Sequence, residues 1–244
     1  DEDALAERDR VGGDIGELVA GQCYWNMGAL WLDRAAQNWA NRTAKGWSDM
    51  EWQVRNWLFT GWASGDHIVE QHVHNLDVMN WAFRAHPVKC TGMGGRAART
   101  DPMFGNIYDH FAVEYEYPNG ARIMSMCRQT AGAAENVSER VVGTAGATFT
   151  DSADGYIRGQ KPWENPQASP NPYVVEHADL VASIKAGKPL NEGRQVAEED
   201  LPDFARLRGS QAGARRQVVG HLAEDPGPAE RRSAEHEGVA AGDL

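Results

Sequence analysis

The sequence has few cysteines, no long apolar run and no excess of positive charge. Its three cysteines, Cys23, Cys90 and Cys127, are far apart and form no CxxC pair, which excludes a disulfide framework, a zinc ribbon and a dithiol redox motif. No apolar stretch approaches the ~20 residues that a membrane-spanning helix requires. The net charge of -11 at pH 7 argues against nucleic acid and anionic membranes as partners, because both attract positive protein surfaces.

The sequence also lacks an initiator methionine and a signal peptide, and it opens with the charged run DEDALAERDR. We expect the chain to begin partway through a longer protein, with residues 1–12 as the remnant of a preceding helix. Localisation therefore stays open: the cytoplasm is favoured, and export is compatible with the missing start.

Tryptophan is the residue that the sequence has in excess. Nine of the 244 residues are Trp, and six of these lie between positions 25 and 57. Such a cluster forms either a packed core or the wall of a ligand pocket, and aromatic faces suit sugars. Packing is the commoner outcome, so we keep the pocket as the secondary interpretation.

The most chemically loaded stretch is GDHIVEQHVHNLDVMNWAF, which begins at Gly65. Its apolar residues recur at three- and four-residue steps behind a Gly-Asp pair that offers an N-cap, so the pattern predicts one helix over 66–83. At about 100° per residue, Glu70, His74 and Asp77 fall within roughly 60° of one another on a different stripe. One face of the helix is therefore expected to pack on a core, while the other carries two carboxylates and an imidazole.

Beyond this helix the apolar period changes to two. Alternation predicts strands, and the turn Pro118-Asn119-Gly120 joins the clearest hairpin, 109–117 with 121–129. A further helix is predicted over 173–186. Upstream, residues 26–49 show no steady periodicity and are expected to form a long loop, after which Ser48 begins a short helix.

Strands joined by hairpins between helices indicate an α+β fold, with a large, mostly antiparallel β-sheet and helices packed on one face. We expect this domain to span residues 13–198. Residues 199–244 are rich in Arg, Ala, Gly, Glu and Pro and nearly devoid of aromatic residues. We expect this tail to be poorly ordered.

An ordered set of segments carries a resemblance to a known family. The set comprises Tyr24-Trp25-Asn26, the Trp-rich stretch 31–57, the helical residues Glu70, His72, His74 and Asp77, the turn Pro118-Asn119-Gly120 and the turn Gly187-Lys188-Pro189. Together these resemble the C-terminal domain of the Gfo/Idh/MocA oxidoreductases, whose helix carries an Asp-x-Gly-x-His-x-x-Asp pattern. The resemblance covers roughly residues 13–197. His72 points about 160° away from His74 on a helix and is expected to be a packed, buried histidine.

The resemblance implies an oxidoreductase that uses NAD or NADP on the CH–OH group of a sugar or polyol, with this chain as its substrate domain. It makes His74 the residue that transfers the proton or polarises the reacting hydroxyl, and Glu70 the residue that orients substrate and tunes His74. A base is needed because the hydroxyl loses its proton as the hydride leaves, and imidazole suits that role. The candidate substrate-binding residues are Asp77, Tyr24, Asn26, Arg55, Asn56 and Trp57. For the last five, packing of the Trp-rich stretch is an equal alternative.

Two features depart from the family. We expect the Rossmann domain that grips the cofactor to be missing from this sequence. The candidate Gly-rich segments, 92–95 and 143–146, lie at predicted strand ends and open no helix, so neither has the context of a dinucleotide-binding turn. We therefore expect no certain cofactor-binding residue and little turnover by this chain alone. The tail after residue 198 also departs from the family, and a change of reading frame would explain it.

Two other functions stay open. One is a non-catalytic sugar-binding or assembly module with the same fold. The other is a metal-dependent hydrolase or isomerase that uses the shared face of His67, Glu70 and His74, although no fourth ligand is evident and we expect no metal. In each case we expect a homo-oligomer that pairs through the open face of the sheet, chiefly through the hairpin 107–129.

Overall fold

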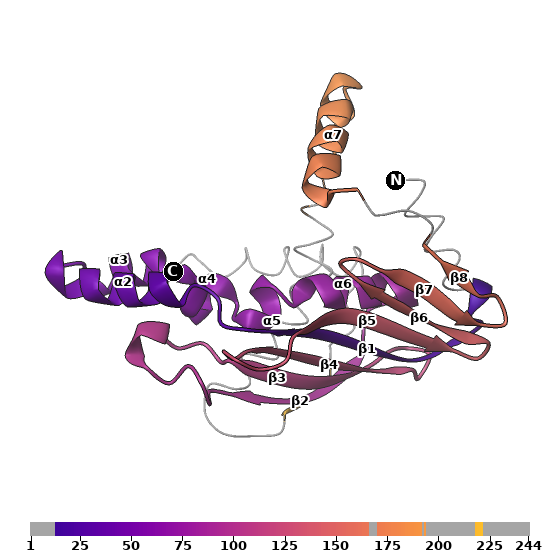
Figure 1. Cartoon of the computed structure of the whole chain (residues 1–244), viewed down its shortest axis with the longest axis horizontal. Helices are drawn as coiled ribbons and strands as arrows, with labels where there is room; N and C mark the ends of the chain where they lie inside the picture. The colour runs from indigo at the N-terminus through magenta and orange to yellow at the C-terminus, as the bar shows by residue number, and fades with distance from the viewer. Residues whose placement is uncertain (1–12, 166–169, 192, 194–217, 222–244) are drawn as a thin grey trace, which may run out of the picture.

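The fold is built on one large β-sheet. The computed structural model of the chain describes residues 13–165, 170–191, 193 and 218–221 (Figure 1). The sheet has nine strands in the order β8-β7-β6-β5-β1-β4-β3-β2-β9. The strands are β1 (Leu18–Met27), β2 (Lys89–Gly95), β3 (His110–Glu116), β4 (Arg122–Gln129), β5 (Asn136–Gly143), β6 (Gly146–Asp151), β7 (Gly155–Gly159), β8 (Trp163–Glu164) and β9 (Val218–His221). The predicted α+β fold with a large, mostly antiparallel sheet is confirmed.

Strand β1 lies in the middle of the sheet and makes it mixed. It pairs antiparallel with β5 and parallel with β4, while the remaining neighbours in the sheet pair antiparallel. A parallel pair needs a long connection, and the helices together with β2 and β3 supply it. The predicted hairpin between β3 and β4 turns at Gly120, whose φ of 82° favours glycine.

Helix α6 (Val73–Phe83) covers one face of the sheet over β1 and β5 (Figure 1). Its buried residues Leu76 and Met79 join the main core. From the sheet, the alternate residues of β3 and β4 join the same core, among them Phe111, Val113 and Ile123. The regular alternation of these strands is what the sequence pattern predicted, and it places α6 directly on the sheet.

The prediction of one helix over 66–83 is wrong. The segment forms two helices, α5 (His67–Glu70) and α6, and Gln71 interrupts them with φ -131° and ψ -53°. The Nε2 of Gln129 on β4 donates to the Gln71 side chain at 2.6 Å, which holds Gln71 toward the sheet and favours the break. His72 N then bonds to His67 O at 3.1 Å, a five-residue step. Directions extrapolated at 100° per residue fail across such a step.

A helical arm, residues 32–64, extends beyond one end of the sheet (Figure 1). It contains α2 (Leu32–Ala44), α3 (Asp49–Arg55), the 3-10 turn η1 (Trp57–Phe59) and α4 (Gly61–Ser64). The loop predicted over 26–49 is therefore wrong. The apolar face of α2 is built largely from alanine, and its buried residue is Ala35, so the helical period was hard to recognise. The cap at Ser48 is confirmed, because its Oγ accepts from Glu51 N at 3.2 Å.

The last helix, α7 (Pro172–Lys185), projects away from the sheet and buries none of its residues (Figure 1). The predicted boundary segment 1–12 lies outside the described residues, as does 199–244 apart from 218–221. Where poor order was predicted, those four residues form β9, which pairs with β2. No helix in the described part of the chain is long and apolar enough to cross a bilayer.

Candidate functional site

The candidate site is built where α5 begins. Asp66 is 1% exposed and has a φ of 76°, a conformation that strains a non-glycine residue. Its carboxylate accepts hydrogen bonds from His67 N at 2.8 Å and from Tyr108 N at 2.9 Å. Hydrogen bonds to a charged acceptor are strong and offset the strain. Asp66 thus fixes the start of α5 to the segment before β3.

His67, Glu70 and Gln129 form a buried polar group between α5 and β4. His67 Nδ1 lies 2.9 Å from Gln129 Nε2 and 3.4 Å from Glu70 Oε1. Gln129 Nε2 also donates to Glu70 Oε1 at 3.3 Å, and only 9% of the Glu70 side chain is exposed. His67 is therefore engaged inside the protein. No group of three His, Cys, Asp or Glu side chains is arranged to hold a metal ion anywhere in the described residues.

His74 lies in the first turn of α6 and is exposed, as is Asp77 one turn further on. The His74 ring lies against Trp25 of β1, with ring centroids 5.8 Å apart and an angle of 35° between the planes. The break after α5 thus divides the predicted stripe. Glu70 turns toward β4, whereas His74 and Asp77 stay on the exposed side.

Tyr24 and Asn26 lie on the opposite face of the sheet from His74. Side chains alternate along a strand, and Cys23 and Trp25 face the helices, as their contacts with His72 and His74 show. Tyr24 and Asn26 therefore face the uncovered side. The structure brings Trp25 to His74 instead, and the period of two in β1 was the signal that could have selected it.

The candidates Arg55, Asn56 and Trp57 lie in the helical arm. Asn56 is 2% exposed and donates to Met103 O at 2.9 Å, so it serves packing. Arg55 pairs with Glu51 at 3.0 Å, and Trp57 is 38% exposed. Arg55 and Trp57 therefore remain partly exposed on the arm.

Asp109, which sequence reasoning missed, organises the loop before β3. Its Oδ2 accepts from the backbone N of Ala97, Ala98 and Arg99 at 2.7–2.8 Å, and its Oδ1 accepts from His110 Nδ1 at 2.6 Å. Burial raises the pKa of Asp109, but these hydrogen bonds outweigh it and bring the pKa below its ordinary value. A buried carboxylate that holds three backbone N–H groups fixes the loop that carries Arg99.

Arg99 was also missed, because nothing in its local sequence distinguishes it. The residue is 2% exposed, and burial lowers the pKa of its guanidinium to about 10, against the opposing effect of the carboxylates of Asp109, Glu70 and Asp66. The group is therefore charged at neutral pH. Its central carbon lies 5.3 and 5.8 Å from the rings of Phe59 and Phe104, and only the three-dimensional fold reveals that proximity.

His72 is buried, as predicted, and joins α6 to the sheet. It is 0% exposed, with Nε2 2.7 Å from Ser125 Oγ and Nδ1 3.1 Å from Asn75 Oδ1. Asn75 donates to Glu139, which also accepts from Thr150 at 2.8 Å. Burial lowers the pKa of His72 to about 3 and raises that of Glu139. The histidine of this hydrogen-bond network is buried and out of reach of a ligand, so the network serves the structure.

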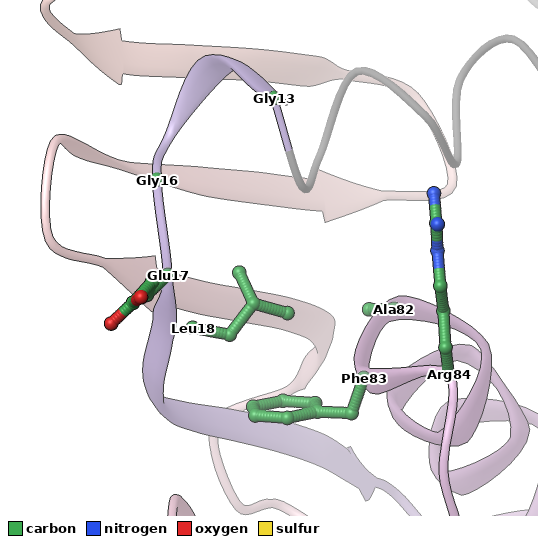
Figure 2. A pocket seen from close by; sticks show the side chains of 7 residues that line it. All are labelled: Gly13, Gly16, Glu17, Leu18, Ala82, Phe83 and Arg84. Carbon is green, nitrogen blue, oxygen red and sulfur yellow. The ribbon is translucent and has the colours of Figure 1, made fainter. Parts of the chain in front are cut away.

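An open groove of about 560 Å³ lies at the far end of α6. Figure 2 shows the side chains of Leu18 and Phe83 facing each other across it, with Arg84 at its rim. His74 and Phe83 lie at opposite ends of α6, so a rise of about 1.5 Å per residue separates them by about 13 Å. The groove is therefore not part of the site at His74.

The described residues contain no turn that fits a dinucleotide. Residues 143–146 connect the antiparallel strands β5 and β6, and 92–95 lie within β2. A pyrophosphate-binding turn instead follows a strand and opens a helix. The residues present therefore do not fit a nicotinamide cofactor, and no reaction step through one follows from this chain.

Comparison with known proteins agrees with this architecture. Residues 11–148 match the model of the GFO/IDH/MocA C-terminal domain. The fold is similar to aldose-aldose oxidoreductase from Caulobacter crescentus complexed with glycerol (16% identity, 90% of this chain and 59% of that chain, TM-score 0.58). It is also similar to myo-inositol 2-dehydrogenase from Lactobacillus plantarum (15%, 91% and 62%, 0.59) and to an inositol dehydrogenase homolog complexed with NAD+ from Azotobacter vinelandii (14%, 90% and 62%, 0.58). No curated protein matches the chain.

The chain thus spans 59–62% of the length of these three proteins, while the family model covers more than half of the chain. The resemblance found in the sequence is confirmed. The chain belongs to the Gfo/Idh/MocA family and contains its C-terminal domain.

Proposed function

We propose that this chain is the substrate domain of an oxidoreductase that acts on the CH–OH group of a sugar or polyol. The observation that carries the proposal is the family match over residues 11–148, together with an exposed imidazole beside an aromatic ring. The relatives complexed with glycerol and with NAD+ support the substrate class and the cofactor. NAD or NADP, held by a separate domain, supplies the hydride acceptor.

His74 takes the proton in this proposal. Oxidation of a secondary alcohol releases a proton from the hydroxyl as the C–H bond breaks, and a neutral imidazole within hydrogen-bond reach accepts it. No hydrogen bond to the His74 ring occurs among the described residues, and the ring is exposed. Its nitrogens are therefore available to a substrate hydroxyl.

Trp25 and Asp77 bind the substrate in the same proposal. The Trp25 ring beside His74 offers an apolar face for the C–H groups of a sugar, and the exposed Asp77 carboxylate accepts from its hydroxyls. Glu70 has an indirect role in this proposal. Its contacts with His67 and Gln129 fix the end of α5, and His74 follows four residues later in the chain. Tyr24, Asn26 and Asn56 do not face His74, so we assign them no substrate contact.

The proposal is tested by supplying the missing half. The nucleotide-binding domain of a relative, such as the myo-inositol dehydrogenase, is fused before Gly13, and NADH formation from myo-inositol and from aldoses is recorded. We expect turnover that falls by roughly 100-fold or more in His74→Ala, because general-base catalysis contributes about that factor. His86→Ala, which removes another exposed histidine, should keep full activity. Equal rates in the two variants would contradict the assignment of His74.

A non-catalytic sugar-binding module is the second candidate. It is favoured by the lack of a dinucleotide-binding turn in the described residues. In that case the completed protein binds a polyol at Trp25 and His74, and no pairing with a nucleotide-binding domain produces NADH.

We also propose that two copies pair through the uncovered face of the sheet. Met93, Ala112, Met126 and Tyr24 are register neighbours across β2, β3, β4 and β1, and Met93 and Met126 are 64% and 37% exposed. Such an apolar row suits a self-complementary interface. Met126→Lys should convert dimers to monomers in light scattering, whereas Met50→Lys on the arm should not. A monomeric wild-type protein would refute the pairing.

A further inference from the structure

Two tryptophans of the Trp-rich region form an exposed aromatic corner. The ring centroids of Trp31 and Trp57 lie 5.8 Å apart with an angle of 86° between the planes, and each residue is 38% exposed. The central carbon of the Arg34 guanidinium lies 4.5 Å from the centroid of the Trp31 ring. Within the described residues the Arg34 side chain makes no hydrogen bond or ion pair. We call Trp31, Arg34 and Trp57 the arm corner.

Trp31 holds a backbone conformation that folding alone disfavours. It is the N-cap of α2 with φ 55° and ψ 32°, and its side chain makes no capping hydrogen bond. The left-handed region strains a non-glycine residue, and the N-cap position favours Ser, Thr, Asp and Asn. An asparagine at this position would relieve both costs. The indole at position 31 therefore points to a role outside folding.

Trp57 is exposed between buried neighbours. Leu58 and Phe59, which follow it in η1, are 3% and 1% exposed and belong to the second hydrophobic core. Asn56, which precedes it, is buried and donates to Met103 O at 2.9 Å. The backbone on both sides of Trp57 is thus fixed. A ligand that binds this ring has little backbone freedom to remove, which favours its affinity.

The arm corner lies close in the chain to the site at His74. Strand β1 carries Trp25, whose ring lies against His74, and Trp31 follows six residues later. Six residues of extended chain span at most about 20 Å. The helices also link the two places, because α2, α3, η1, α4, α5 and α6 each contact the next one (Figure 1). One ligand of several sugar units is thus long enough to touch both.

The charges of the arm favour an uncharged ligand. Two of its arginines are compensated by carboxylates, Arg42 by Asp49 and Arg55 by Glu51. A polyanion requires a strong positive surface, which these pairs remove. The N–H groups of the Arg34 guanidinium are donors that suit hydroxyl oxygens, and aromatic faces pack on the C–H groups of a sugar. The arm corner therefore suits a neutral saccharide.

We propose that the arm corner binds a remote sugar unit of the substrate, which is then a saccharide of several units with its reacting hydroxyl at His74. The inference rests on the proposed function, because it extends the substrate site placed at Trp25 and His74. One ring of the corner packs on a face of the remote unit and the other ring on its edge. Arg34 donates hydrogen bonds to its hydroxyls.

The test compares the affinity of this chain for glucose, maltotetraose and cellotetraose by isothermal titration calorimetry. We expect one of the tetrasaccharides to bind at least about 10-fold more tightly than glucose, because its remote unit adds contacts with two aromatic rings. Equal affinity for glucose and for both tetrasaccharides would overturn the proposal.

Variants separate the arm corner from the rest of the arm. In Trp31→Ala and in Trp57→Ala, the ratio of the dissociation constants for glucose and the tetrasaccharide should fall to about 1, whereas Trp57→Phe should keep most of the wild-type ratio. Trp62→Ala is the matched control, because Trp62 is 59% exposed on the same arm and its Nε1 donates to Gln53 Oε1 at 2.6 Å. The control should keep the full ratio. An equal loss in Trp62→Ala would contradict the assignment of the corner.

NMR provides a measurement that needs no substitution. If the alanine variants do not fold, the indole N–H signals of Trp31 and Trp57 in the ¹⁵N-labelled wild-type chain decide. They should shift saturably with the tetrasaccharide and stay in place with glucose. Signals that do not move with either tetrasaccharide, or that move equally with glucose, would refute the proposal.

This outcome is separable from the proposed function. The binding measurements need no cofactor and no turnover, so the gain in affinity with chain length can be present while the fused enzyme stays inactive. Conversely, turnover of myo-inositol or aldoses that depends on His74, without any gain in affinity with chain length, would support the proposed function and refute the role of the arm corner.

Discussion

Two buried polar groups lie on either side of the break between α5 and α6, and they differ in kind. The group around His72 links Ser125, Asn75 and Glu139 by hydrogen bonds into one chain. The group around Glu70 joins the carboxylate and the His67 ring to the side-chain amide of Gln129 on β4. The first joins α6 to the sheet, whereas the second joins α5 to it.

The difference distinguishes a buried polar group that serves packing from one that supports the candidate site. A neutral imidazole with both nitrogens hydrogen-bonded stabilises one packing arrangement and has no nitrogen left to bind a ligand. In the second group, Glu70 and His67 share the Gln129 amide, which fixes the end of α5 from which the chain continues to His74. Two groups of similar burial, a few residues apart in the chain, thus serve different ends.

The largest effect on stability is expected from the loop that carries Arg99. Asp109→Ala removes the acceptor of three backbone N–H groups and should lower the free energy of unfolding by about 3 kcal/mol. Asp101→Ala is the control, since it removes an exposed cap that accepts from Met103 N at 2.9 Å and should cost about 1 kcal/mol. Urea unfolding at neutral pH measures both. Equal losses would show that the loop does not depend on Asp109.

The group around His72 should reveal itself through pH. The pKa of the His72 imidazole is lowered to about 3 in the folded chain. Below pH ~6.5 the imidazole of the unfolded chain therefore binds a proton that the folded chain does not bind. The stabilising contribution is complete above that pH and falls as the pH drops toward 3, by about 2 kcal/mol between pH 7 and pH 5. Unfolding at both pH values should show a smaller difference in His72→Gln. The same difference in wild type and variant would contradict the buried neutral state.

The smallest effect is expected at Glu139, at the other end of that chain. Burial raises its pKa, so stability falls as the pH rises through the folded-state pKa and the buried group ionises. Glu139→Gln keeps the shape and removes that loss, so it should change stability by less than about 1 kcal/mol and gain on wild type as the pH rises above 4.5. If the variant instead becomes less stable than wild type as the pH rises, the ionised form of Glu139 is the favoured one.

The sequence predicted what regular periodicity encodes. Alternation located the strands, and the Pro-Asn-Gly turn located the hairpin between β3 and β4. The helical spacing between His72 and His74 also identified His72 as buried. The break at Gln71 was not predictable, because its cause is Gln129, 58 residues later in the chain. The difference in exposure between Glu70 and His74 follows from the same break.

Other parts of the site depend on which face a residue occupies. Tyr24, Trp25 and Asn26 are consecutive, and the strand direction sends only Trp25 toward His74. Nothing in the local sequence marks Arg99, and the hydrogen bond from its backbone N to Asp109 exists only in the folded chain. The sequence thus located the helices that carry the site, while long-range contacts determined its composition.

The most direct test of this account is a polyol titration of the ¹⁵N-labelled chain followed by NMR. We predict that myo-inositol or glucose produces saturable shifts in the indole N–H of Trp25 and the ring signals of His74, while those of the buried His72 stay in place. Shifts confined to the tryptophans of the helical arm, or no saturable shift at Trp25 and His74, would contradict the claim that the substrate binds at the exposed start of α6.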